Sequence, residues 1–110
     1  MAAGPNTSVS LTATGQSAAI PVSKHKSGNI PVGLVLDFTT VAAVGTANAE
    51  FTFDGFDAIA AGTAVWIPLT SLSAKTATTM DSTTMPMTAV RLNVTAYTSG
   101  TITLRVNQGV

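Results

Sequence analysis

The sequence predicts an all-β protein, because short runs of alternating apolar and polar residues recur along the chain while helix signals are almost absent. At 110 residues the chain has the size of one domain. Several short strands separated by turns, without long helices, are typical of a single antiparallel β-sandwich or jelly roll. We therefore expect a short N-terminal arm over residues 1–7 and a β-sandwich domain over residues 8–110.

The first strands are predicted before residue 40. Val9 and Leu11 alternate with serine and threonine, which indicates a short first strand. Pro21 lacks a backbone N–H, so it favours an edge position for the next strand, over residues 18–22. Residues 30–40 form the longest apolar run. Asp37 falls on the opposite face from the main apolar residues of this run, and we expect that face to meet water or a partner.

The middle of the chain contains the only helix candidates. Residues 39–50 include Gly45 and β-branched residues, so we expect no helix there. The Ala-rich stretch of residues 57–64 is compatible with one helical turn capped by Asp57. The remaining segments are interpreted as strands over residues 51–54 and 65–70 and as a long, Thr-rich loop over residues 71–87.

The clearest local pattern lies at the C-terminus and predicts a hairpin. Apolar residues occupy the even positions on both sides of residues 98–100, where Gly100 fits a left-handed position at a bulge. This register pairs Leu92 with Val106 and Asn93 with Arg105, and it avoids placing two arginines opposite each other. The outer face would then present Arg91, Asn93, Thr95, Tyr97, Thr103, Arg105 and Asn107.

Charge is sparse in this sequence. Charged residues make up 9% of the chain, five basic and five acidic groups cancel, and the mean hydropathy is +0.40. So few charges do little to keep copies of the chain apart, which favours association. Scattered lysines and arginines argue against a nucleic-acid partner. The absence of cysteine excludes disulfides and thiolate metal sites, and no apolar run is long enough for a membrane helix.

The residues that could support catalysis or metal binding form no recognisable constellation. His25, the only histidine, lies between Lys24 and Lys26 in a polar segment, and we interpret it as a solvated loop residue. Asp54 and Asp57 flank a glycine, as in some calcium loops, but Asp-Gly is also a common turn. The chain has enough carboxylates for a glycosidase-like pair, but nothing in their spacing suggests one. We expect no enzyme activity, no cofactor and no metal.

The aromatic residues and the methionines leave alternatives open. Trp66 and Tyr97 could stack on a sugar, as in a carbohydrate-binding β-sandwich module, although core packing is the favoured role for Trp66 in its apolar strand. Tyr97, beside the predicted turn, is expected to be exposed. The remaining cluster, Met80, Met85 and Met87, is expected either to fill the core or to adapt to a neighbouring subunit.

Two stretches in the second half of the chain resemble small bacteriophage virion proteins of the capsid decoration or cement type. FTFDGFDAIAAGTAVWIPL resembles their pattern of a strand, an Asp-Gly turn and an aromatic strand ending in leucine. TAVRLNVTAYTSGTITLRV resembles their closing hairpin, with an arginine in its first strand. The resemblance implies a jelly-roll-like sandwich that decorates or cements a capsid, or that belongs to the tail, and it implies no catalytic residues.

From the composition and this resemblance together, we expect a structural protein on the capsid exterior of a virion. It would bridge neighbouring major capsid proteins and associate with itself about a symmetry axis. A tail or neck component is the alternative within the same class, and a sugar-binding module is the alternative of another class. The predicted contact residues are Met1, Pro5, Thr7, Met80, Met85, Met87, Arg91, Asn93, Tyr97 and Arg105.

Overall fold

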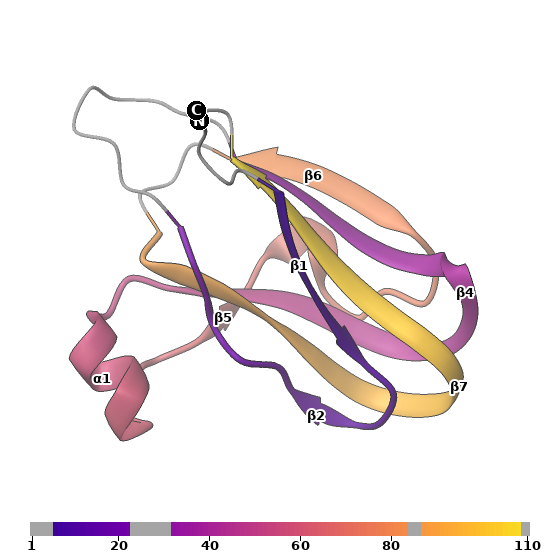
Figure 1. Cartoon of the computed structure of the whole chain (residues 1–110), viewed down its shortest axis with the longest axis horizontal. Helices are drawn as coiled ribbons and strands as arrows, with labels where there is room; N and C mark the ends of the chain where they lie inside the picture. The colour runs from indigo at the N-terminus through magenta and orange to yellow at the C-terminus, as the bar shows by residue number, and fades with distance from the viewer. Residues whose placement is uncertain (1–5, 23–31, 84–86, 109–110) are drawn as a thin grey trace.

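A computed structural model describes residues 6–22, 32–83 and 87–108. It confirms the all-β class, because its strands form one antiparallel sheet and its α-helix is a single short one (Figure 1). The elements are β1 (Asn6–Leu11), β2 (Gly15–Gln16), β3 (Ile20–Pro21), β4 (Val32–Thr52), α1 (Phe56–Ala61), β5 (Ile67–Pro68), the 3-10 helix η1 (Thr70–Leu72), β6 (Thr79–Thr83) and β7 (Ala89–Gln108).

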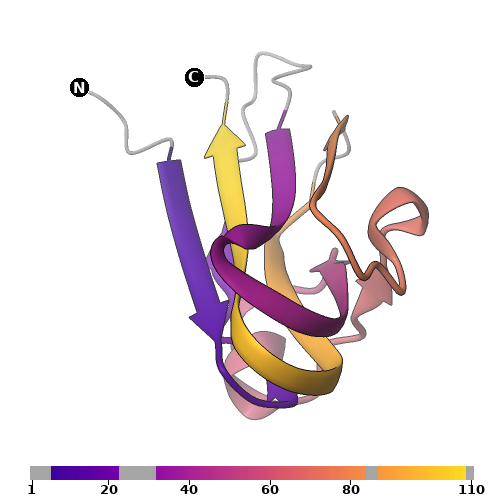
Figure 2. The same ribbon diagram turned by 90° about the vertical axis from the view of Figure 1, so that its right-hand side faces the viewer.

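Two long strands organise the sheet. β4 and β7 pair antiparallel along almost their whole length, from Val32 opposite Gln108 to Thr52 opposite Ala89. Both strands curve back on themselves, so that the paired ribbon forms a half-barrel (Figures 1 and 2). One half of this ribbon carries β1 and β6, and the other half carries β2, β3 and β5. The strands therefore belong to one continuous sheet of seven strands.

Glycines permit the sharp bend of the ribbon. Gly100 has a φ of +82°, and a Cβ atom there would lie 2.0 Å from the carbonyl oxygen of Ala42. A Cβ atom at Gly45 would lie 2.6 Å from the carbonyl oxygen of Ala96. The pairing shifts register several times between Asp37 and Ala47, as expected for bulges that bend a sheet. Side chains cannot be accommodated where the two strands cross this closely.

The core lies between the two halves of the bent sheet. Even-numbered residues of β7 face it at both ends of the strand, because alternate residues of a strand point to the same side. The largest fully buried apolar side chains come from both halves and from the segments that connect them: Leu34, Leu36, Leu72, Met87, Val90, Leu92, Val94, Ile102, Leu104 and Val106. A single hydrophobic cluster therefore holds both halves together.

The predicted C-terminal hairpin is wrong, because residues 89–108 form one continuous strand. Leu92 pairs with Ala49 and Val106 with Leu34, so they do not pair with each other; likewise Asn93 pairs with Asn48 and Arg105 with Val35. The alternation of apolar residues correctly identified the buried face, and the left-handed conformation of Gly100 is confirmed. Alternation fixes the face of a strand but not its partner, which here is the equally long β4.

Other sequence predictions have mixed outcomes. Pro21 lies in an edge strand as expected. The predicted loop over residues 71–87 is wrong, because it contains part of η1 and all of β6. The expected helical turn is present as α1, but Gly55 is its N-cap and the predicted cap, Asp57, lies in the first turn. His25 lies outside the described residues.

Candidate functional site

The outer face of one half of the sheet carries a hollow of about 490 Å³. It crosses four adjacent strands, β1, β7, β4 and β6. Gly33 is among its lining residues: a Cβ atom there would meet only the backbone oxygen and the Cβ atom of Asn107, at 3.7 and 3.9 Å, so the space beside the glycine is largely open. We call this region the outer hollow. Its lining residues are Thr7, Ser8, Gly33, Leu34, Val35, Met80, Arg105, Val106 and Asn107.

Met80 gives the outer hollow an apolar rim that is open to solvent. Its side chain is 74% exposed, the largest value among the exposed large hydrophobic residues. Met80 lies directly opposite Val35 in the β4–β6 pair, so the two side chains share the outer face. An unbranched thioether side chain adapts its shape to a partner more readily than a branched one. The rim can therefore fit an irregular apolar surface.

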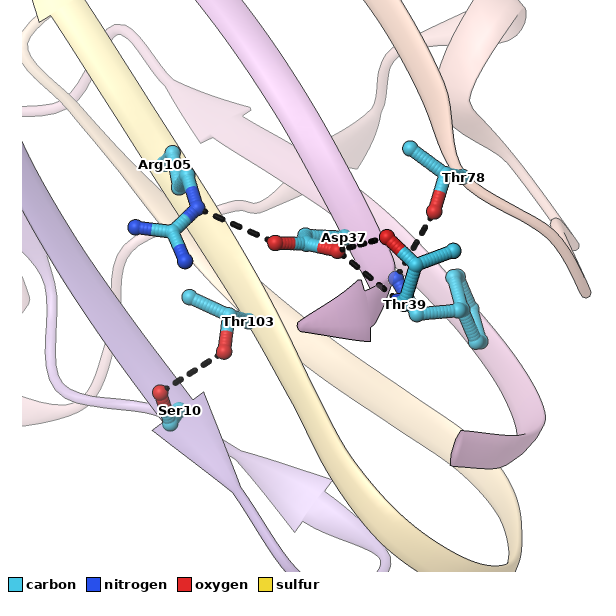
Figure 3. Close-up of polar contacts among 7 residues, drawn as sticks. Ser10, Asp37, Thr39, Thr78, Thr103 and Arg105 are labelled. Carbon is cyan, nitrogen blue, oxygen red and sulfur yellow. Dashed lines mark hydrogen bonds and ion pairs between the residues drawn. The ribbon is translucent and has the colours of Figure 1, made fainter. Parts of the chain in front are cut away.

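Arg105 forms the polar rim of the outer hollow and is held in place by Asp37 (Figure 3). Its Nε donates to Oδ2 of Asp37 at 3.1 Å. The other carboxylate oxygen of Asp37 accepts from the backbone N–H and the hydroxyl of Thr39, at 2.8 and 3.0 Å. Asp37 is buried, whereas the Arg105 side chain is 47% exposed. Arg105 is thus oriented before any partner arrives, which reduces the entropy lost on binding.

Hydroxyl side chains form further hydrogen bonds on either side of the Asp37–Arg105 ion pair (Figure 3). The hydroxyls of Ser10 and Thr103 share a hydrogen bond of 2.9 Å that links β1 to β7. On the other side of β4, the hydroxyl of Thr78 accepts from the backbone N–H of Phe38 at 3.0 Å. These neutral contacts tie neighbouring strands together around the outer hollow, and they add no charge to it.

A second ionic cluster lies on the other half of the sheet. Glu50 is buried, and its two oxygens accept from Arg91 Nε and Asn93 Nδ2, both at 2.8 Å. The Arg91 guanidinium also lies 4.4 Å from the centroid of the Trp66 ring, in cation–π geometry. Arg91 and Asn93, predicted as contact residues, are therefore engaged in contacts within the chain and lie apart from the outer hollow.

Trp66 and Tyr97, the two aromatic residues considered for sugar stacking, do not form an exposed platform in the described structure. Trp66 is half-buried against Arg91 and does not belong to the core, so the expected core packing is wrong. Its apolar neighbours Val65 and Ile67 are themselves exposed, because they lie in or beside the edge strand β5. An apolar run in the sequence therefore does not bury Trp66. Tyr97 is not fully exposed as predicted: it packs against the core, and its hydroxyl donates to the carbonyl oxygen of Gly100 at 2.8 Å. Tyr97 thus braces the bend.

The predicted methionine and N-terminal contacts have different outcomes. Met87 is fully buried in the core, so its assignment to an interface is wrong, and it fills space as a core residue does. Met80 is exposed in β6, and Thr7 lies in β1. Both residues line the outer hollow together with Arg105. Met1, Pro5 and Met85 lie outside the described residues.

Two features of the surface were not predicted from the sequence. Gly33 was not singled out, although a glycine inside an apolar strand signals a missing side chain in the sheet face. A group of exposed apolar residues near α1 and β5 was also missed: Phe53, Phe56, Val65 and Ile67, each at least 44% exposed. Phe53 alternates with polar residues, and Val65 and Ile67 flank Trp66 in an apolar run, so burial was expected. However, β5 lies at the edge of the sheet.

The acidic residues of the described chain are used locally. Asp54 Oδ2 accepts from the backbone N–H of Val65 at 2.6 Å, and Asp57 accepts from the backbone N–H of Ala58 at 3.0 Å. The Ser71 hydroxyl, and then the backbone N–H of Ser82, lower the pKa of Asp81 by hydrogen bonding to its carboxylate. Among the residues that the structure describes, no three potential metal ligands of the His, Cys, Asp and Glu types come together. No helix in this part of the chain has the length and hydropathy of a membrane span.

No protein-family model and no curated protein matches the chain. Among solved structures, it is similar to a chain of the Bacillus endospore appendages, which are described as a novel family of disulfide-linked pili. The likeness covers 96% of this chain and 85% of the other, with 18% sequence identity and a TM-score of 0.40. At these values it supports no statement about function. That neighbour is a bacterial spore pilus protein and not a phage protein.

Proposed function

We propose that this chain is a structural virion protein that decorates or cements a bacteriophage capsid by bridging neighbouring major capsid subunits. The outer hollow would be its contact surface on the shell. The single observation that supports this best is Met80, an apolar side chain 74% exposed beside a hollow that has one charged residue, Arg105, in its lining. Such a surface is costly to leave in water and favourable to cover with protein.

The chemistry of the outer hollow favours a protein partner. An apolar side chain of the partner would fill the space above Gly33 and pack against Val35 and Met80. Arg105, whose side chain is 47% exposed, would donate a hydrogen bond to a carboxylate or backbone carbonyl at the rim. The hydrogen bond that Arg105 Nε donates to Asp37 within the chain fixes the orientation of the guanidinium. A small apolar centre with a polar rim is the usual composition of a specific protein contact.

Repetition would strengthen a modest contact. A standard interface buries about 800 Å² on each partner. On a capsid, the same contact recurs at every equivalent lattice position, and a subunit that touches two neighbours gains from the high effective concentration of the second. The overall architecture that we propose for this role is a jelly-roll-like β-sandwich, supported by a core enclosed between the two halves of the bent sheet.

The proposal is tested by binding to shells assembled from the major capsid protein of the same genome. Met80→Lys is the decisive variant, because it places a charge at the apolar rim beside Arg105. We expect it to lose most of its occupancy on shells, measured by co-sedimentation, while its thermal unfolding stays close to that of the unchanged chain. Phe56→Lys, at another exposed apolar position, is the matched control and should keep its occupancy.

Two outcomes would point elsewhere. If the unchanged chain ignores shells but binds tail or neck assemblies, the protein is a component of those parts. If it ignores all virion parts, the proposal is wrong. The sugar-binding alternative receives no support from the geometry, since Trp66 already stacks with Arg91 and Tyr97 is hydrogen-bonded to Gly100.

A further inference from the structure

The edges of the sheet differ in how open they are to another strand. An edge strand exposes unpaired backbone N–H and C=O groups, and proteins usually block such edges with proline, inward-pointing charges or very short strands. β3 and β5 have two residues each, with Pro21 in one and Pro68 in the other. β2 also has two residues, and Gly15 within it has a φ of +134°. These three edges are poor templates for pairing.

β6 is longer but is blocked by a charge. Asp81 lies opposite the buried Leu34, so its side chain points to the inner side of the sheet, toward η1. There it accepts a hydrogen bond from the Ser71 hydroxyl. A strand added beside β6 would bring further backbone and side chains against this carboxylate. The arrangement disfavours pairing at this edge.

β1 is different, because Asn6–Leu11 has six residues, no proline and no charge. In Figure 2, β1 forms the outer margin of its half of the sheet, with β7 on one side. Within the described ranges of the chain, no strand pairs with the other side of β1. Its inward side chains Val9 and Leu11 pack against the core but are only partly buried, so this edge leaves apolar surface uncovered.

The hydrogen bonds of β7 identify which groups of β1 point outward. Leu92 bonds to Ser17 on the β2 side through its backbone N–H and C=O, at 2.9 and 2.8 Å, and so points away from β4. Even-numbered side chains face the core at both ends of β7. The same alternation therefore directs the backbone N–H and C=O groups of Ile102, Leu104 and Val106 toward β1. Their partners there are Leu11, Val9 and Thr7. The backbone groups of Asn6, Ser8 and Ser10 therefore point to the open edge.

We propose that two copies of this chain pair through β1, antiparallel about a two-fold axis, so that their sheets become continuous. A two-fold contact requires a self-complementary surface. β1 meets this requirement because it is neutral, and because an antiparallel register centred on Ser8 places the outward backbone groups of Asn6 opposite those of Ser10 in the second copy. The pairing also covers the partly exposed edges of Val9 and Leu11. It depends on β1 and not on the identity of the shell.

Proline at position 8 tests the pairing directly. Ser8→Pro removes an N–H that points to the second copy while sparing the bonds between β1 and β7. Ser8→Ala keeps this N–H and is the matched control. We expect the unchanged chain and Ser8→Ala to reach twice the 11.1 kDa mass of one chain in sedimentation equilibrium. Ser8→Pro should stay at the mass of one chain, with unchanged circular dichroism.

A charge pair keeps the test decisive if Ser8→Pro fails to fold. In the register centred on Ser8, the two copies of this residue lie opposite each other, so Ser8→Lys alone and Ser8→Asp alone place like charges together. Each should be monomeric, and a mixture of the two should form a dimer. A monomeric unchanged chain at high concentration, or equal self-association of all variants, would overturn the inference. These assays contain no shell, so their failure is distinct from a failure of the proposed capsid role.

Discussion

Gly100 lies against the backbone of Ala42 so closely that a Cβ atom at position 100 would be 2.0 Å from the Ala42 carbonyl oxygen. This contact lies where β4 and β7 bend together, and the conformation of Gly100, with φ at +82°, is one that other residues rarely adopt. The hydroxyl of Tyr97 holds the carbonyl of the same residue. The bend that creates both halves of the sheet depends on this point.

Replacing Gly100 by alanine should therefore destabilise the fold by at least about 2 kcal/mol, since backbone strain and a steric clash add. Gly62→Ala is the matched control: this glycine also has a positive φ, +77°, but a Cβ atom there would have no neighbour within 4 Å. It should cost only about 1 kcal/mol. Urea unfolding of the two variants measures the difference. Equal losses would show that the close approach at the bend does not matter.

The buried Glu50 should make Arg91 important for stability. Arg91→Leu leaves the carboxylate with Asn93 as its remaining side-chain partner in the described structure, and we expect a loss of about 2 kcal/mol or more. Adding Glu50→Leu removes the stranded charge and should restore much of the loss. A double-mutant cycle by urea unfolding measures the coupling. Additive single effects would contradict a dominant role for this ion pair.

Asp81 should make part of the stability depend on pH. Its pKa in the folded chain lies below its ordinary value, because the ionised carboxylate accepts the Ser71 hydroxyl. Folding therefore favours the ionised form, and this contribution is present above the pKa of the unfolded chain and lost as the pH falls through the folded pKa. Ser71→Ala should have a lower melting temperature than the unchanged chain near neutral pH, and the difference should shrink in acid. A difference that is constant with pH would contradict this cause.

The sequence predicted the class of fold and the buried faces, but it could not predict how the strands pair. Val90, Leu92 and Val94 on one side of Gly100, and Ile102, Leu104 and Val106 on the other, were assigned correctly to one face, because strand alternation is a local property. Their partners along β4 lie between 39 positions away, for Val90 and Phe51, and 72 positions away, for Val106 and Leu34. Nothing local distinguishes a hairpin at Gly100 from a bend at Gly100. The left-handed conformation of Gly100 was predicted, but its role in bending one continuous strand was not.

The candidate site was predicted only in part, for a similar reason. Thr7, Met80 and Arg105 come from different parts of the chain and meet only because β1, β7, β4 and β6 lie side by side. The outward direction of Asp37 was expected, but its bond to Arg105 depends on the register between β4 and β7. Met87 was grouped with Met80 as a contact residue, although Met87 is buried and Met80 is exposed. The sequence alone could not distinguish the two methionines.

If the chain decorates a capsid as we propose, another protein covers the outer hollow in the assembled particle. Because the chain has no cysteine, Met80→Cys introduces a single thiol at the rim, and Thr95→Cys introduces one at an exposed position outside the hollow. We expect a maleimide probe to label both variants equally in the free chain and to label Met80→Cys far more slowly on assembled shells, with Thr95→Cys unchanged. Equal labelling of Met80→Cys in the free and shell-bound states would show that the outer hollow is not covered on the shell.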